Sequence, residues 1–147
     1  MSGMKPIDIL LVEDNPVDIR MTQEAFRDYR VANKLHVVTD GKAAMDFLHQ
    51  RGEYEDALRP DLIILDLNLP KKDGREILAE IKADDHLRGI PVIVLTTSVV
   101  DKDIIGSYCN HANAFVTKPI ELDAFVTMMR TIGDFWLTFA KLPNEAT

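Results

Sequence analysis

The stretch "LLVEDNP", residues 10–16, ends an apolar run with two adjacent acids, Glu13 and Asp14. The run belongs to Ile7–Val12, whose aliphatic composition is typical of a strand buried on both faces. Two neighbouring carboxylates at a strand end repel each other, and no basic residue stands directly beside them. They could belong to a solvated helix N-terminus, since Asn15-Pro16 suits a helix start. They could also belong to a functional site assembled from the ends of several strands. The residues at the other strand ends distinguish these two possibilities.

Strand-like and helix-like segments alternate along the whole chain. Five short apolar runs occur, at Ile7–Val12, Leu35–Val38, Leu62–Leu65, Val92–Leu95 and Ala114–Val116. The segments between them carry apolar residues at helical spacing, in three groups: Ile77, Leu78 and Ile81; Ile104, Ile105, Tyr108 and Cys109; Leu122, Phe125, Val126 and Met129. This alternation predicts an α/β fold with a parallel sheet and right-handed crossovers.

Length, charge and cysteine content narrow the class of protein. The 147 residues suit one domain, and a net charge of −7 argues against a general nucleic-acid or anionic-membrane binder. No apolar stretch is long enough to span a bilayer, and the N-terminus lacks a signal-peptide pattern, so we expect a cytoplasmic protein. The single cysteine, Cys109, excludes an internal disulfide and is expected to be a packed thiol in a helix over 104–112. The four histidines show no spacing typical of a metal site.

Polar residues follow the predicted strands where function gathers in such sheets, beyond the strands' carboxyl ends. Glu13-Asp14 follows the first strand, and Asp66 ends the third, within "LIILDLNLP". The fourth strand ends in Thr96-Thr97-Ser98, where Thr97 or Ser98 could take the place of Thr96, and the fifth ends in Thr117-Lys118-Pro119. The second strand instead ends in Thr39-Asp40-Gly41, which is more typical of a cap on the next helix.

The chemistry of this set is that of a metal-assisted phosphoryl acceptor. Three crowded carboxylates raise one another's pKa unless a cation intervenes, and Mg²⁺ accepts such oxygen ligands. A lysine ammonium and a threonine hydroxyl can both pair with an added anionic group. One carboxylate can then act as a nucleophile and form an aspartyl phosphate. We therefore interpret the acids of the opening stretch as metal ligands.

Four motifs in order resemble the receiver domain of two-component response regulators. They are "VEDN" (12–15), "LDLNLPKKDG" (65–74), "PVIVLTTS" (91–98) and "FVTKP" (115–119), and the match covers nearly the whole chain. The resemblance implies a flavodoxin-like, doubly wound, five-stranded parallel sheet of order 2-1-3-4-5. The chain departs from the family pattern at three places: Glu at position 13, Phe at position 115 and an extended segment "QRGEYEDALRP" (50–60). Asp73-Gly74 is interpreted as a turn without chemistry.

The resemblance also implies site roles. Asp66 would accept the phosphoryl group from a histidine kinase, Asp14 would bind Mg²⁺ directly, and Glu13 would bind it through water. Mn²⁺ could replace Mg²⁺, and the backbone carbonyl of Asn68 would complete the protein's metal ligands. Such a domain is a phosphoacceptor, which at most catalyses its own phosphorylation and dephosphorylation.

Three further residues would transmit the signal. The resemblance implies that Thr96 is the switch hydroxyl, Phe115 the switch aromatic and Lys118 the phosphate-pairing amine. Thr96 and Phe115 are expected to move together on phosphorylation. A cis Lys118-Pro119 bond would aim the ammonium into the site.

The segment 50–60 and the tail "IGDFWLTFAKLP" (132–143) resemble the stand-alone response regulators of bacterial and cyanobacterial phytochromes. This predicts one receiver domain over 1–147, with a core over about 6–132, an extension over about 133–147 and no output domain. The fifth helix is predicted from about Glu121 to Ala140, docked through Leu122, Phe125, Val126, Met129 and Ile132. Its remaining large residues, Phe135, Trp136, Leu137 and Phe139, could cover the chain's own domain. We expect instead a homodimer through helix four, strand five, helix five and this aromatic tail.

Two other functions were considered. An aspartyl-phosphate phosphohydrolase on a similar sheet would carry a second Asp two residues after the nucleophile, where this chain has Asn68. A dinucleotide-binding module would need a glycine-rich turn after the first strand, where this chain has Glu13 and Asp14. The receiver fits the strand ends better than either.

Overall fold

The predicted strands form a single parallel sheet in the computed structural model, which describes residues 6–27, 29, 32–69, 73–96 and 114–139. The strands are β1 (Ile7–Val12), β2 (Asn33–Val38), β3 (Leu62–Asp66), β4 (Val92–Thr96) and β5 (Ala114–Thr117). Their order is β2-β1-β3-β4-β5, with every neighbouring pair parallel. This confirms the predicted doubly wound, flavodoxin-like topology.

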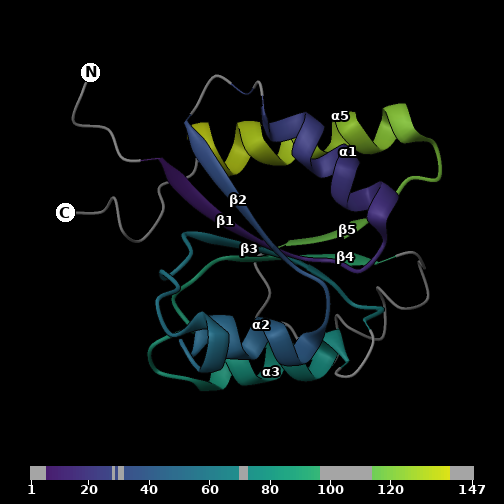
Figure 1. The fold of residues 1–147 in the computed structure, drawn as a ribbon. Coiled ribbons are helices and arrows are strands. Elements are labelled where there is room, and N and C mark those ends of the chain that lie inside the picture. The colour runs from purple at the N-terminus through teal and green to yellow at the C-terminus, as the bar shows by residue number, and fades with distance from the viewer. Residues whose placement is uncertain (1–5, 28, 30–31, 70–72, 97–113, 140–147) are drawn as a thin grey trace.

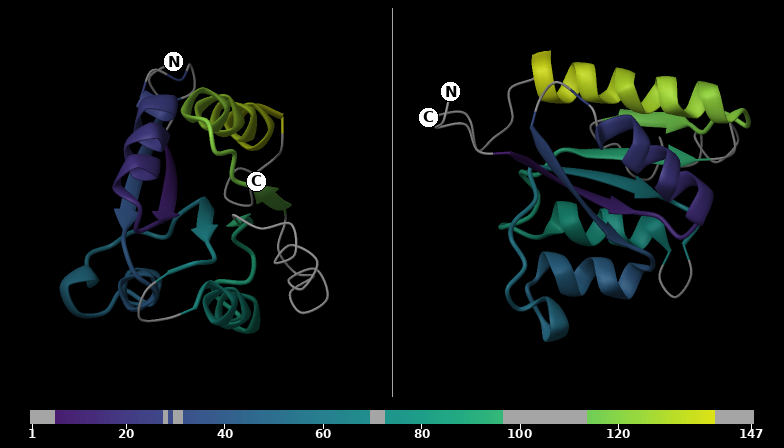
Figure 2. Two further views of the ribbon diagram at one scale, coloured as in Figure 1. Left: turned by 90° about the vertical axis from the view of Figure 1, so that its right-hand side faces the viewer. Right: turned by 45° about the horizontal axis from the view of Figure 1, so that its top comes forward.

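Helices lie on both faces of the sheet, with α1 and α5 on one face and α2 and α3 on the other (Figures 1 and 2). Their bounds are α1 (Pro16–Arg27), α2 (Gly41–Leu48), α3 (Gly74–Ala83) and α5 (Leu122–Gly133), with a 3-10 turn, η1 (Gly52–Tyr54), after α2. The predicted helix around Cys109 lies outside the described residues. Within the described ranges, no helix is both long enough and apolar enough to cross a bilayer.

Burial explains why the central strands are almost purely aliphatic. Every residue of β3 and β4 is buried, whereas the edge strand β5 is only half-buried along its length. Along β1, Leu10 and Val12 join the core on the α2–α3 side, and Ile9 and Leu11 join the core on the α1–α5 side. This alternation follows from the two-residue side-chain period of a strand, so a strand covered on both faces needs apolar residues throughout.

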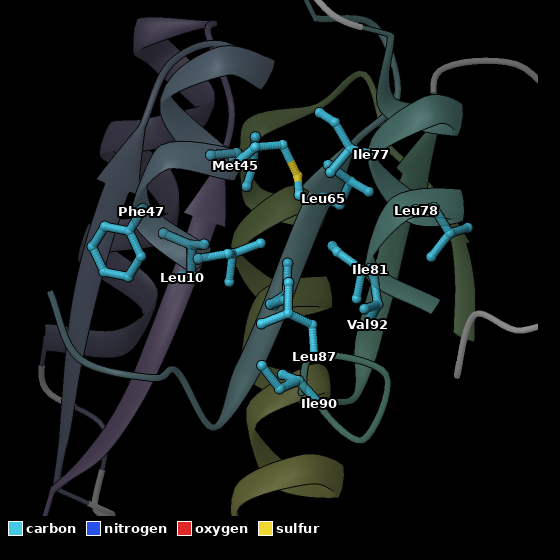
Figure 3. Close-up of a cluster of buried hydrophobic side chains, with 14 of the residues drawn as sticks. Leu10, Met45, Phe47, Leu65, Ile77, Leu78, Ile81, Leu87, Ile90 and Val92 are labelled. Carbon is cyan, nitrogen blue, oxygen red and sulfur yellow. The ribbon is translucent and has the colours of Figure 1, made fainter. Parts of the chain in front are cut away.

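The core on the α2–α3 side is shown in Figure 3. The apolar faces of α2 and α3 meet the sheet there, through residues that include Met45, Phe47, Ile77, Leu78 and Ile81. The predicted helical face of Ile77, Leu78 and Ile81 is confirmed, because all three are buried.

Short polar side chains begin the helices at the carboxyl edge of the sheet. Asn15 Oδ1 accepts from the backbone N–H of Val17 at 2.9 Å, which caps α1 one residue before Pro16. Asp40 Oδ1 accepts from the N–H of Ala43 at 2.8 Å, which confirms the predicted cap on α2. These caps stabilise the sharp turns from strand to helix that position the site residues.

The fifth helix continues past its α-helical part as a π-helical segment, η2 (Asp134–Phe139). Its last residue, Phe139, lies next to the predicted end at Ala140. Phe125, Met129 and Ile132 are buried as predicted, but Leu122 is 50% exposed, so its predicted docking role is wrong. Residues 121–124 are all exposed, so the packed face begins only at Phe125.

The start of η2 contacts the body of the domain. The Tyr29 hydroxyl donates to Asp134 Oδ1 at 2.6 Å, and Trp136 packs against the α1–α5 core. Phe135 stacks edge-on against Trp136, with ring centroids 5.2 Å apart, yet remains 54% exposed. One tail aromatic therefore packs on its own domain while its neighbour faces solvent.

Candidate functional site

Residues from four strand ends meet at the carboxyl edge of the sheet. Glu13 directly follows β1, Asp66 ends β3, Thr96 ends β4 and Lys118 follows β5. The strand order places β1 and β4 on either side of β3, so the residues after them flank Asp66. The meeting point predicted from the strand ends is therefore present in the structure.

Three acidic residues form a compact oxygen-rich group. Glu13, Asp14 and Asp66 each offer one carboxylate oxygen, and these oxygens all lie within 4.8 Å of one another. Glu13 and Asp66 are buried, with 1% and 3% exposed, whereas Asp14 faces solvent. Hard oxygen donors clustered in this way suit Mg²⁺ or Mn²⁺, and the exposed Asp14 leaves the group open to solvent.

Lys118 contacts two of these acids and one more. Its Nζ donates to Glu13 Oε1 at 2.7 Å, to Asp18 Oδ2 at 3.0 Å and to Asp66 Oδ2 at 3.2 Å. The lysine side chain is only 8% exposed. An ammonium held among carboxylates partly offsets their mutual repulsion.

Asp18 was not predicted as a site residue. It lies in the first turn of α1, four residues after Asp14. Asp14 precedes the helix, so helical spacing does not pair the two residues, and an acid in the first turn is an ordinary feature of a helix start. Nothing in the sequence alone indicated that Lys118, one hundred residues away, would reach it.

Burial and charge shift the titration of two groups. Burial first, and then the hydrogen bond and negative charge of Asp66, raise the pKa of Glu13 from 4.5 to about 8, against the opposing effect of Lys118. Burial disfavours the charged Lys118, but its hydrogen bond with Glu13 and the negative charges of Asp66 and Glu13 outweigh burial and raise the Lys118 pKa. The lysine is therefore charged across the physiological range, and Glu13 holds a proton more readily than a free carboxyl.

The remaining predicted residues lie at the end of β4, in the loop after β3 and on β5. Thr96 is fully buried, and its carbonyl accepts from the backbone N–H of Lys118 at 2.7 Å. The backbone N–H of Asn68 donates to Asp66 Oδ1 at 3.1 Å, which holds the loop after β3 against the carboxylate. Phe115 is half-buried and packs against the α2–α3 core.

The predicted cis bond between Lys118 and Pro119 is wrong. Among the described residues no peptide bond is cis, so this bond has the ordinary trans geometry. From a trans backbone the long lysine stem still brings Nζ to three carboxylates, so no isomer change is needed to aim it.

Gly74 has a structural role that the sequence did not indicate. It is the first residue of α3, and its N–H donates to the carbonyl of Leu67 at 3.2 Å. A Cβ at this position would lie 2.6 Å from Leu67 Cα and 2.8 Å from the carbonyl oxygen of Asp66. The absence of a side chain lets α3 begin directly against the strand end that carries Asp66.

Comparison with known proteins identifies the family. Residues 9–130 match the response regulator receiver domain. The chain belongs to the response regulator receiver family. This membership favours the receiver over the phosphohydrolase and the dinucleotide-binding module.

Several relatives of this receiver are known. It is 51% identical to response regulator Rcp1 of Synechocystis over 138 residues, which cover 94% of each chain. It matches the crystal structure of the phosphorylated cyanobacterial phytochrome response regulator RcpA with a TM-score of 0.89 and 51% identity, over 95% of this chain and 99% of that one. It matches the Mn²⁺-bound form of Rcp1 with the same TM-score and identity, over 94% and 99% of the two chains.

Proposed function

We propose that this receiver accepts a phosphoryl group on Asp66 from the phosphohistidine of a sensor histidine kinase. A carboxylate oxygen of Asp66 forms the new bond to phosphorus. The bond from phosphorus to the imidazole nitrogen breaks, and the nitrogen keeps its electron pair. The observation that carries the proposal is the placement of Asp66. It is buried at the end of β3, hydrogen-bonded by Lys118 and grouped with Glu13 and Asp14.

The neighbouring residues have distinct roles in this proposal. Asp14 and Glu13, with Asp66 and the Asn68 carbonyl, would hold Mg²⁺ or Mn²⁺, and the Mn²⁺-bound form of Rcp1 supports this choice of ion. A bound divalent cation supplies positive charge that offsets the crowded carboxylates and the transferring oxygens. Lys118 supplies a second positive charge, through an ammonium that the site keeps protonated.

The phosphoacceptor role can be tested by intact mass. After incubation with acetyl phosphate and Mg²⁺, the wild type should gain one phosphoryl group that hydroxylamine removes, because it is an acyl phosphate. Asp66→Asn should not be labelled. Asp61→Asn is the matched control, because Asp61 is a second buried aspartate, next to the other end of β3, and its variant should be labelled like wild type. Equal labelling of the Asp66 variant would exclude Asp66 as the acceptor.

The ranking of the metal ligands is a separate test. Asp14→Ala should weaken Mg²⁺ binding more than Glu13→Ala, if Asp14 binds directly and Glu13 binds through water. The opposite ranking would exchange their assigned roles, and isothermal titration calorimetry on both variants measures it.

We propose a phytochrome-type kinase as the partner, because RcpA is a phytochrome response regulator and the similarity covers nearly the whole chain. Purified phytochrome-type kinase, labelled on its histidine, should transfer phosphate to this receiver and not to Asp66→Asn. An unrelated histidine kinase is the control. Equal rates from both kinases would refute the assignment of the partner.

The proposed switch couples Thr96 and Phe115. If the Thr96 hydroxyl is drawn toward the phosphoryl group, it vacates space beside β5 that the Phe115 ring can enter. A beryllofluoride complex, which imitates the phosphorylated state, should show both side chains displaced. An unchanged Phe115 rotamer in that complex would contradict the coupling.

The proposed homodimer uses helix four, β5, α5 and the aromatic tail. Helix four lies outside the described residues, so the proposal rests on the exposed Phe135 ring beside the packed Trp136. Truncation at Gly133 is a poor test, because it removes Asp134 and Trp136, which contact the domain. Phe135→Ser should instead reduce self-association in sedimentation velocity at tens of micromolar, with and without beryllofluoride. If wild type is itself a monomer under all these conditions, the dimer proposal fails.

A further inference from the structure

Among the residues that the structure describes, Asp18 is the one side-chain partner of Lys118 outside the three-carboxylate group. Its Oδ2 accepts from Lys118 Nζ at 3.0 Å, and its side chain is 18% exposed. Its backbone N–H donates to Asn15 Oδ1 at 3.2 Å, so the cap of α1 holds this residue in place. The carboxylate is therefore presented to the lysine by a capped first helical turn.

Lys118 has three N–H donors, and each has a carboxylate acceptor in this structure. Two of these acceptors, Glu13 and Asp66, also belong to the carboxylate group that fits a divalent cation. A carboxylate that binds the cation attracts the ammonium less strongly, because its negative charge is then partly neutralised. Asp18 is not part of the carboxylate group found among the described residues, so its contact with the lysine can persist when the others weaken.

We propose that Asp18 is a positioning residue for Lys118. It retains the ammonium beside the site when Glu13 and Asp66 turn to a cation, and it leaves the remaining N–H groups of the lysine for phosphoryl oxygens. The second part of this role rests on the function proposed above, whereas the first part concerns cation binding alone.

The proposal has a specific energetic consequence. Without the Asp18 carboxylate, the whole attraction of the Lys118 ammonium falls on Glu13 and Asp66, where it competes with the cation. Asp18→Asn should therefore weaken cation binding, and it should do so through Lys118. If Asp18 merely added negative charge to the site, the weakening would not depend on the lysine.

A double-mutant cycle on Mn²⁺ affinity distinguishes these two cases. Free Mn²⁺ is measured by electron paramagnetic resonance for wild type, Asp18→Asn, Lys118→Met and the double variant, without any phosphodonor. Asp18→Asn should raise the Mn²⁺ Kd about tenfold when Lys118 is present, because the amide oxygen can still accept a hydrogen bond but no longer carries the charge that offsets the ammonium. In the Lys118→Met background the same change should raise Kd by about twofold or less, as expected from long-range charge alone.

Asp123→Asn is the charge-matched control. Asp123 is exposed in the first turn of α5, and its variant changes the net charge by the same amount as Asp18→Asn. It should have no more than the small long-range effect. Equal weakening by Asp18→Asn in both lysine backgrounds, or no weakening beyond that of Asp123→Asn, would overturn the proposal.

A kinetic measurement tests the phosphoryl part. At saturating Mn²⁺, Asp18→Ala should be phosphorylated by acetyl phosphate more slowly than wild type, and Asp18→Asn, which keeps an acceptor oxygen, should recover part of the rate. Equal rates for all three proteins would refute this part of the role. If wild type is not labelled on Asp66, the proposed function fails, while the Mn²⁺ cycle still decides whether Asp18 positions Lys118.

Discussion

Replacing Gly74 with Ala should destabilise the receiver, although Ala is the better helix former. The added methyl group would lie 2.6 Å from Leu67 Cα, 2.8 Å from the Asp66 carbonyl oxygen and 3.0 Å from the Leu67 carbonyl oxygen. All three neighbours are backbone atoms of the segment that ends β3, so no side-chain rotation can relieve the contacts. Either the start of α3 or the Asp66 strand end must move.

The expected size follows from two opposing effects. Overpacking in a close-packed site costs about 1–3 kcal/mol, and contacts with backbone favour the upper part of that range. The gain in helix propensity from Gly to Ala is at most about 1 kcal/mol. We expect a net loss of about 2 kcal/mol in the free energy of unfolding, which for a chain of this size lowers Tm by about 4–8 °C.

Urea unfolding followed by circular dichroism measures this loss directly. Gly89→Ala is the matched control, because the nearest atom to its Cβ is the Arg59 side-chain nitrogen at 3.8 Å, an ordinary contact. Since the close contacts of Gly74 include the Asp66 backbone, Gly74→Ala should also slow phosphorylation by acetyl phosphate. A free energy of unfolding within about 0.5 kcal/mol of wild type would show that α3 shifts without cost, and that Gly74 is not required for close packing against β3.

Three further outcomes are expected. Because the folded-state pKa of Glu13 is raised from 4.5 to about 8, the native metal-free protein binds more protons than the unfolded chain between these values. The contribution of Glu13 to stability should therefore be greatest below about pH 4.5 and should fall as the pH rises toward 8. Glu13→Gln should flatten this decrease in the free energy of unfolding. An unchanged decrease in the variant would mean that other groups cause it. Tyr29→Phe removes the 2.6 Å hydrogen bond to Asp134 and should lower the free energy of unfolding in urea by about 1.5 kcal/mol. The rate of phosphorylation should not change, and a changed rate would show that η2 is coupled to the site. Asp40→Ala removes the cap on α2 and should cost about 1 kcal/mol, whereas Asp40→Asn, which keeps an acceptor, should cost less; equal losses would mean that the cap is not the cause.

The architecture of this receiver can be predicted from its amino-acid sequence, because the features that encode it are local. Near-continuous aliphatic runs predicted the buried strands to within about two residues, since strands covered on both faces can carry little else. The polar residues after those runs predicted which side chains would meet, since the carboxyl ends of parallel strands share one edge. Asp66, Glu13 and Lys118 were found in this way, and the structure brings them together.

Contacts between segments that are distant in sequence depend on how the folded elements pack. Asp18 is an ordinary acidic residue of a helix start until Lys118 reaches it across the sheet edge. Gly74 is an ordinary turn glycine until the backbone of Leu67 is placed against it. The trans Lys118–Pro119 bond and the packing of Trp136 beside an exposed Phe135 also depend on where neighbouring elements lie. The spacing of apolar residues predicts which face of a helix or strand a residue occupies, and the strand ends predict which residues reach the same edge of the sheet. The distance between two atoms, in contrast, depends on how the elements pack.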